Sequence, residues 1–178
     1  MLYFSQFPKT TYDMRGDGNK KTITNIWRRV KVRSKIVNNL ALLDKYDVQE
    51  GESPETVAYK AYGTTDYFWV VCLVNDIVNR YYDWPLDEYN FQQYVADKYT
   101  NPAGIHHYEK LQSSGHITAE GPADYNHYIE VNSDDPQAQS VSNIEYERRL
   151  QDKKRQIRLL SPQYLQAFED EFQKLISK

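Results

Sequence analysis

The sequence has a single cysteine, few glycines and prolines, and no long hydrophobic run. Its 178 residues include one Cys, seven Gly and seven Pro. Cys72 therefore has no partner for an internal disulfide, which favours folding in a reducing compartment. Val71 and Leu73 flank it, and a thiol between apolar neighbours is typical of a buried, inert cysteine rather than a nucleophile. The longest apolar run, Phe68–Val74, is far too short to span a bilayer.

The sequence also lacks a secretory leader and a strongly basic composition. The first residues, MLYFSQFPKTTYD, have neither a charged start nor a sustained apolar run. We therefore expect a protein that stays in the cytoplasm where it is made, with no membrane partner. The formal net charge of −3 argues against general nucleic-acid binding. The basic run Arg28–Lys35 is the best nucleic-acid candidate, but a solvated or protein-docking face explains it better.

No catalytic or cofactor-binding motif is found along the chain. It contains no P-loop, no dinucleotide-binding fingerprint and no Ser-His-Asp elbow. The pair Asp83–Trp84 superficially suggests a sugar site. The sequence Asp-Trp-Pro-Leu is more simply a turn, in which the aspartate bonds backbone amides and the tryptophan packs as an anchor. We predict that the protein is not an enzyme and needs no cofactor.

All four histidines fall in one short region, which the pattern predicts as a small sheet. Imidazoles gathered in one place suit zinc. However, neighbouring residues of a strand point to opposite faces, so His106 and His107 are expected to contribute at most one ligand. His116 and His127 are the other two, and no cysteine is close in sequence. A structural role for the histidines, without a metal, is the preferred interpretation.

Tyrosine is what the sequence has in abundance. Sixteen Tyr and three Trp accompany a hydrophobic content of 40%, which is below the usual share for a self-sufficient domain. Tyrosine combines an apolar ring with a polar hydroxyl, so it suits half-buried and interface positions. We expect much of the packing surface to face other proteins. A soluble domain with a tyrosine-rich surface is the competing interpretation.

Residues 44–100 are predicted to form the core of the protein, beginning with a strand and a helix. The strand spans Lys45–Val48 and leads through a glycine turn into the helix. Ser53 is an N-cap that offers an acceptor to the first free amides, and a proline follows it directly. Gly63 ends the helix, because glycine adopts the left-handed conformation without a Cβ clash.

Two more helices are predicted within this core segment. The first is apolar on every side, runs from about Asp66 to Val74, and ends at Asn75. The second begins after Asp87, which is a good N-cap, and continues to about Tyr99 with an aromatic face. The core therefore has the order strand, helix, helix, with a further helix after an aromatic segment.

The N-terminal residues 1–43 are predicted to be an arm and a connecting segment. Residues 1–21 look extended, and Phe4 and Phe7 suit docking on a partner. Residues 22–43 fit a helical face or an alternating strand equally well, and we favour a helix followed by extended chain.

The C-terminal third is predicted to contain a small sheet, a linker and two helices. Residues 101–131 consist of short alternating segments around glycine turns and predict a β-hairpin or small meander. Residues 132–178 begin with a polar linker, followed by a charged helix from about Val141 to Leu160. Ser161–Pro162 caps and opens a final helix, and the short connection predicts that the two helices pair as a hairpin. The fold class is therefore α+β.

The core segment resembles a LysM module. LysM modules bind N-acetylglucosamine polymers, so glycan binding is one function that the likeness implies. A LysM unit normally closes with a second strand, and Arg80–Leu86 stands in that place here. The residues that carry the likeness or the expected core are Tyr46, Gly51, Ser53, Ala58, Tyr62, Gly63, Trp69 and Asn75.

Further segments, in order, resemble the wedge component with a LysM-like core found in T4-type contractile phage baseplates. They are Ile26–Trp27, Tyr82–Leu86, Tyr94–Tyr99, Ile105–Glu109 and the charged helix around Glu145–Ile157. This resemblance implies a structural protein, assembled in the host cytoplasm and located in the tail baseplate of the virion. It also implies a clamping role that joins wedge proteins and helps neighbouring wedges associate. The implied partners are the inner wedge-ring proteins and the sheath-initiating wedge protein.

Aromatic and apolar residues of these segments are expected at partner interfaces. Trp69 and Trp84 are expected to anchor the core or an interface. The arm and the C-terminal helices, which are poor in apolar residues, are expected to become ordered on partner surfaces. The interface candidates are Ile26, Trp27, Tyr81, Tyr82, Trp84, Tyr94, Tyr108, Leu165, Phe168 and Phe172.

Overall fold

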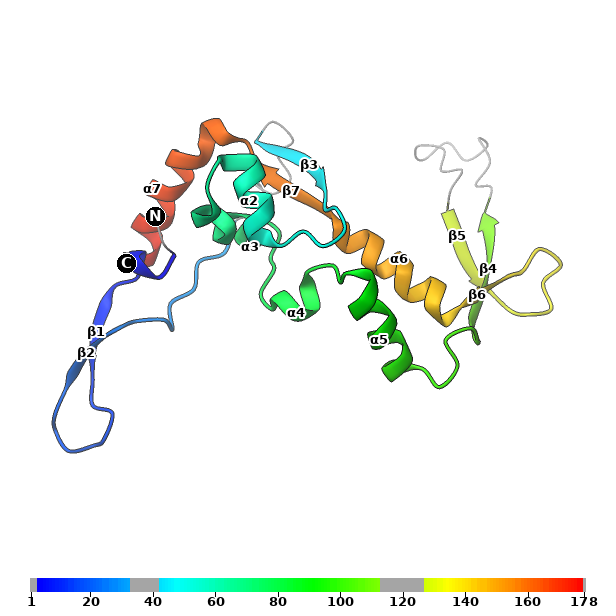
Figure 1. Ribbon diagram of the computed structural model, residues 1–178, viewed down its shortest axis with the longest axis horizontal. Coiled ribbons are helices and arrows are strands. Elements are labelled where there is room, and N and C mark those ends of the chain that lie inside the picture. The colour runs from blue at the N-terminus through cyan, green and yellow to red at the C-terminus, as the bar shows by residue number, and fades with distance from the viewer. Residues whose placement is uncertain (1–2, 33–41, 113–126, 178) are drawn as a thin grey trace. The chain divides into compact units, whose positions relative to one another are not determined.

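The computed structural model shows a mixed α+β chain with small sheets (Figure 1). It describes residues 3–32, 42–112 and 127–177. The chain divides into two compact units. Unit 1 contains Met1–Pro85 and Lys154–Lys178, and unit 2 contains Leu86–Lys153. Both ends of the chain therefore belong to unit 1, and unit 2 is the stretch between them.

The N-terminal arm of unit 1 is a β-hairpin rather than an extended chain followed by a helix. A short 3-10 helix, η1 (Tyr3–Gln6), leads into strand β1 (Lys9–Tyr12), which pairs antiparallel with β2 (Lys21–Thr24). The helix predicted for residues 22–43 is wrong over its described part, because β2 occupies its start and residues 25–32 are not helical. The start of this segment instead follows the alternating pattern that also fitted it, because it pairs with β1 as a strand.

The strand–helix–helix order predicted for the core is confirmed. Strand β3 (Leu43–Asp47) precedes helix α2 (Pro54–Tyr62), a 3-10 turn η2 (Thr65–Tyr67) and helix α3 (Phe68–Val74). The side chain of Ser53 accepts a hydrogen bond from the amide of Thr56, as expected of an N-cap. Gly63 ends α2 with a φ of 76°, which a residue with a Cβ rarely adopts.

The second strand of this sheet comes from the far end of the chain. Strand β7 (Gln156–Leu160) runs antiparallel to β3, with Leu43 opposite Leu160 (Figure 1). The helix predicted for residues 141–160 therefore ends early, because α6 stops at Arg155. Ile157 and Leu159 point into one apolar cluster of unit 1. Their two-residue spacing is a strand pattern that five residues alone do not distinguish from the end of a helix.

The final helix is confirmed, but its predicted partner is wrong. A 3-10 turn η3 (Pro162–Tyr164) leads into α7 (Leu165–Ser177). Because β7 separates α6 from α7, the short helix–helix connection on which the predicted hairpin depended does not exist. Ser161 does not cap with its side chain. Its backbone amide instead donates to the carbonyl of Leu42 at 3.0 Å, next to the Leu43–Leu160 pair of the sheet.

Two apolar clusters form the core of unit 1, and α3 contributes to both. Trp69, Val70 and Val74 lie in the first cluster, and Val71 lies in the second. The first cluster joins α3 to Phe7, which lies between η1 and β1, and to α7. The second joins α3 to α2, β7 and Trp84. A helix that is covered on both sides has no polar face, which explains the continuous apolar run in the sequence.

Unit 2 contains a helix, a three-stranded sheet and most of a second helix. Helix α5 (Glu88–Lys98) is followed by β4 (Ile105–Gln112), β5 (His127–Val131), β6 (Gln139–Ser142) and α6 (Asn143–Arg155). The predicted cap at Asp87 is confirmed, since it accepts from the amide of Asn90. Of the two alternatives predicted for residues 101–131, the structure has the β-hairpin, formed by β4 and β5. It is not a meander, because β6 pairs with β4 and not with β5. The strand order of the sheet is β5-β4-β6, so its third strand comes from the end of the predicted linker and the start of the predicted long helix.

Candidate protein interface

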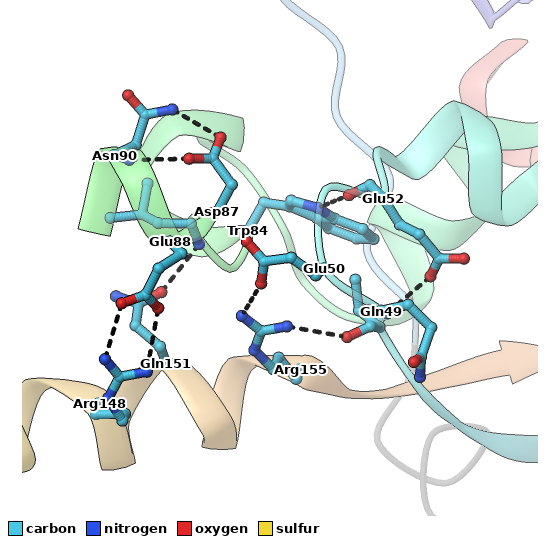
Figure 2. A network of polar contacts seen from close by, with 12 residues as sticks. Gln49, Glu50, Glu52, Trp84, Asp87, Glu88, Asn90, Arg148, Gln151 and Arg155 are labelled. Carbon is cyan, nitrogen blue, oxygen red and sulfur yellow. Dashed lines mark hydrogen bonds and ion pairs between the residues drawn. The ribbon is translucent and has the colours of Figure 1, made fainter. Parts of the chain in front are cut away.

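Glu52 organises the loop between β3 and α2, where several of the residues on which the predicted LysM resemblance rests lie. Its carboxylate accepts from the hydroxyl of Tyr46 at 2.9 Å and from the amide of Gln49, and it pairs with Lys60 (Figure 2 shows Gln49). Burial acts to raise the pKa of Glu52, but the hydrogen bonds from Lys60, Gln49 and Tyr46 outweigh it and leave the pKa lowered. The carboxylate is thus charged and fixed in place. Gly51 supplies the turn with a φ of 74°.

Asn75 joins the end of α3 to β7. Its side-chain amide donates to the carbonyls of Val71 and Arg158, both at 2.8 Å, and its oxygen accepts from the amide of Arg158 at 2.8 Å. The remaining residues expected to belong to this core lie where a core requires them. Ala58 and Trp69 are buried, and Tyr62 packs against the second cluster. Burial raises the pKa of the Tyr62 hydroxyl to about 12.

Trp84 is a core residue of unit 1 and is only 6% exposed. Its indole Nε1 donates to the carbonyl of Glu52 at 2.7 Å, which ties the aromatic segment to the β3–α2 loop (Figure 2). Arg155, which is also drawn in Figure 2, binds Glu50 of the same loop at 2.8 Å. Trp84 is therefore an internal anchor, as Phe172 also is. Leu165 and Phe168 are partly buried against the same core as Phe172.

The turn that precedes Trp84 presents two tyrosines to solvent. Tyr81 is 83% exposed and Tyr82 is 72% exposed, both on the one-turn helix α4 (Arg80–Asp83). The turn is held from both ends, since Asn79 caps it by accepting from the amide of Tyr81. Asp83 accepts from the amides of Val78 and Asn79, and these bonds lower the pKa of its carboxyl. Tyr81 and Tyr82 therefore project from a fixed backbone.

A second exposed aromatic lies just after the hairpin of the arm. Trp27 is 88% exposed, and Ile26 beside it is also exposed. The amide of Ile26 bonds the carbonyl of Thr24, and the amide of Trp27 bonds the side chain of Asn25. This tight turn directs the chain away from β2 and leaves the indole without cover among the described residues.

In unit 2, an ion pair between a buried carboxylate and an exposed lysine links α5 to α6. Glu147 is 2% exposed and accepts from Lys98 and from the hydroxyl of Tyr99, both at 2.7 Å. Burial acts to raise the pKa of Glu147, but these bonds outweigh it and lower the pKa. On the same side, Tyr94 is exposed and Lys98 lies over its ring. Tyr108 of β4 is only partly exposed. The sequence signal that was missed is the lone Glu147 within the apolar stripe of α6.

The two neighbouring histidines lie together rather than on opposite faces. Their Nδ1 atoms are 2.8 Å apart, and the ring of His106 stacks on Tyr146. The register of β4 shifts between Ile105 and His107, so strict alternation fails at this point and the prediction of opposed rings is wrong. His127 lies on β5, and His116 lies outside the described residues. In the part of the chain that the structure describes, no three His, Cys, Asp or Glu side chains gather to hold a metal ion.

A groove of about 730 Å³ in unit 1 is lined mainly by apolar side chains. Cys72 lies on it and is half-buried, and burial raises the pKa of its thiol to about 11. The thiol is therefore protonated near neutral pH, as an inert cysteine would be. Ion pairs at the rim, Arg80 with Glu55 and Lys31 with Asp76, are internal to the chain. Within the described ranges, no helix has both the length and the apolar composition needed to cross a membrane.

Comparison with known proteins identifies one family. The family described as base plate wedge protein 53 matches residues 1–118 of the chain. The matched region takes in the arm, the whole β3–α2–α3 segment, the Tyr81–Tyr82 turn and α5. A search of curated proteins found no match.

Proposed function

The chain belongs to the base plate wedge protein 53 family, and from this premise we propose that it clamps baseplate wedge proteins together. Family membership makes it a structural component of the phage tail baseplate that associates with other baseplate proteins. The clamping role is narrower. It means that exposed elements of one chain bind more than one neighbour and help adjacent wedges associate. Inner wedge-ring proteins and the sheath-initiating wedge protein are the partners we propose, with assembly in the host cytoplasm.

The observation that carries this proposal is that hydrogen bonds fix the backbone from which the exposed aromatic side chains project. Tyr81 and Tyr82 lie on a turn that Asn79 and Asp83 fix through backbone hydrogen bonds. Trp84, directly after them, is buried and bonded to Glu52. Aromatic side chains on a preorganised backbone lose little conformational freedom on binding, and such residues dominate protein interfaces. A rigid aromatic projection is more useful to a structural joint than to an isolated soluble domain.

We further propose that unit 1 is a LysM-like core whose closing strand is displaced along the chain. Strand β7 occupies the position beside β3 that a closing strand requires, and residues 76–155 are inserted before it. The side chain of Asn75 supports this view, because it bonds both backbone groups of Arg158 across the insertion. The core serves here as a rigid plug from which the arm and the Tyr81–Tyr82 turn extend.

Glycan binding, the alternative function, is disfavoured by Trp84. The segment that follows α3 packs back on the β3–α2 loop through the indole of Trp84, and its Nε1 uses the carbonyl of Glu52. Glu52 itself is bonded to Tyr46, Gln49 and Lys60, so this loop has few free polar groups for a sugar. We also propose that the protein is not an enzyme, since the half-buried thiol of Cys72 is held protonated and the family is structural.

The test is reconstitution with the other wedge proteins of the same phage. The purified chain is mixed with each candidate partner and with pairs of partners. The complexes are separated by size-exclusion chromatography, and their molecular masses are measured. If the chain is a clamp, it forms a ternary complex with two partners, and the two partners do not form a complex with each other when this chain is left out. Tyr81→Ala/Tyr82→Ala is expected to weaken one of the two contacts and leave the melting temperature unchanged. Tyr59→Ala, an exposed tyrosine of α2, is the matched control. Binding of a single partner, with no ternary complex, would contradict the clamp.

A further inference from the structure

The hairpin arm, defined here as residues 9–29, is fixed to unit 1 at both of its ends. Phe7, just before it, is buried and lies against Phe172 of α7, with ring centroids 6.5 Å apart. Arg28, near its end, donates to the carbonyl of Ile176 at 3.0 Å in the last turn of α7. A guanidinium at the C-terminal end of a helix also meets the negative end of the helix dipole. The base of the arm is thus anchored on one helix.

The tip of the arm is also held in shape. The carboxylate of Asp13 accepts from the amides of Arg15, Gly16 and Gly18, at 3.1, 2.7 and 2.8 Å. These bonds, chiefly that from Gly18, lower the pKa of Asp13, so its charge persists to acid pH. Between anchored base and fixed tip, the two strands have almost no cover, since most of their residues are exposed. A two-stranded hairpin is marginal in water on its own, and this one has both edges free within the described residues.

Exposed apolar side chains continue along the arm towards its base. Tyr12 pairs with Lys21, and Thr10 pairs with Ile23. Directly opposed residues share a face, as do residues two apart, so Tyr12 and Ile23 lie on the same face of the hairpin. Both are exposed, and Trp27 follows beyond the end of β2. A large indole with this exposure at the base of a fixed projection is a strong candidate for the centre of an interface.

The charge of the arm is opposite to that of the rest of the chain. Residues 9–29 contain six basic and two acidic side chains, a net charge of +4 in a chain whose net charge is −3. Within the chain, Arg28 bonds the carbonyl of Ile176, and Asp13 accepts from backbone amides at the tip of the arm. The other basic side chains make no ion pair within the described residues; they are Lys9, Arg15, Lys20, Lys21 and Arg29. Exposed cations beside exposed apolar groups are complementary to an acidic surface that also offers an apolar pocket.

We propose that the arm docks on an acidic protein surface of another baseplate component, with Trp27 filling a pocket on that surface. A protein suits the arm better than a nucleic acid does. Ile23, Ile26 and Met14 are exposed aliphatic side chains that phosphates do not engage, and the free strand edges offer backbone groups to another strand. The inference rests on the proposed function, because it presumes that the chain binds other baseplate proteins. It adds the chemistry of the partner and the segment that contacts it.

The experiment measures binding of the full chain to each purified wedge protein of the same phage, by calorimetry at several salt concentrations. Trp27→Ala is expected to weaken one interaction by at least tenfold. Lys20→Glu/Lys21→Glu is expected to weaken the same interaction strongly at low salt and less at high salt, since screening reduces steering and attraction between exposed charges. The matched controls are Tyr89→Ala, an exposed aromatic of unit 2, and Lys45→Glu/Lys153→Glu, a charge reversal off the arm. Both controls should bind as the parent does.

The possible outcomes separate the two proposals. If wedge proteins bind the parent chain but the arm variants bind equally well, the docking arm is wrong and the structural role stands. If no wedge protein binds the parent chain, the proposed function and the arm fail together. A single-stranded oligonucleotide is included as a further probe. Tighter binding of the oligonucleotide than of any wedge protein, lost in Trp27→Ala, would overturn the assignment to an acidic protein surface.

Discussion

The side-chain amide of Asn75 bonds both backbone groups of Arg158, although the two residues are separated by 83 positions in the sequence. Each of these hydrogen bonds is 2.8 Å long, and a third one joins the same amide to the carbonyl of Val71. One side chain thus supplies hydrogen-bond partners for a backbone carbonyl of α3 and for the backbone amide and carbonyl of one residue of β7. The link therefore joins two segments of unit 1 that are far apart in the sequence.

Replacing Asn75 by alanine is expected to destabilise unit 1. The substitution leaves the amide and carbonyl of Arg158 without their partner, and a buried polar group without a hydrogen bond costs about 1–3 kcal/mol. Denaturant unfolding followed by tryptophan fluorescence measures the change, since Trp69 and Trp84 lie in the clusters of unit 1. Asn19→Ala at the exposed tip of the arm serves as the control. A midpoint equal to that of the parent chain would show that the amide is not needed.

The three tryptophans should respond differently to truncation. Trp69→Ala removes a side chain that is 3% exposed, and truncating a buried aromatic costs about 3–5 kcal/mol. A clear fall in the melting temperature is expected. Trp27→Ala, at a site that is mostly exposed, should change stability by less than about 0.5 kcal/mol. Thermal unfolding of the two variants and the parent decides the matter, and equal melting temperatures for all three would rule out burial of Trp69.

Unit 2 is expected to lose stability in acid through Glu147. Its pKa in the folded chain is below the ordinary value of 4.5, so the stabilisation is present above that value and is lost as the pH falls through the lower folded value. Lys98, Tyr99 and the ring of His106 are the groups that favour the charged carboxylate.

Glu147→Gln removes this contribution. The variant is expected to be about 1–3 kcal/mol less stable than the parent near neutral pH. The difference in stability should narrow as the pH falls below the ordinary value of 4.5 and through the lower pKa of the folded chain. Urea unfolding at a series of pH values, followed by a probe placed in unit 2, gives the two curves. Glu171→Gln, an exposed carboxylate of α7, is the control. Parallel curves for Glu147→Gln and the parent at every pH would contradict the assignment.

Unit 1 is expected not to bind chitin or peptidoglycan fragments with useful affinity. Trp84 and the bonds around Glu52 occupy the β3–α2 loop, and unbonded polar groups for a sugar are scarce there. Titration of chitin oligomers into the full chain by calorimetry is the measurement. Saturable binding at micromolar concentration would favour the glycan-binding function and count against a purely structural role.

The pattern of amide protection from hydrogen exchange should differ from the pattern that the apolar composition of the chain predicts. Few apolar residues at both ends of the sequence predict fast exchange there. In the structure, β7 and α7 supply Ile157, Leu159 and Phe172 to the core of unit 1, so we expect them to be protected together with α3. The hairpin of the arm should exchange fast in the free chain and slow when its partner binds. Uniform protection of the free chain would contradict the expectation that the arm becomes ordered only when its partner binds.

Local chemistry in the sequence determined the elements whose signals lie within a few residues. Ser53 and Gly63 bound α2, Asp87 begins α5, and the apolar run of α3 predicts a helix that is covered on all sides. Each of these signals acts through a cap, a left-handed turn or a side-chain period, and none requires a distant partner. The order and spacing of short aromatic segments also identified the baseplate family, which the match over residues 1–118 confirmed.

Tertiary structure decided what depended on distant partners. The five residues of β7 become a strand because β3 lies beside them and because Ile157 and Leu159 gain burial against Trp84. The ambiguous start of the segment 22–43 becomes β2 because β1 pairs with it, and the two histidines meet because a bulge interrupts alternation in β4. Exposure likewise separated Trp27 from Trp84. Both are tryptophans in aromatic segments of the sequence, but only the folded chain places one in the core and leaves the other uncovered.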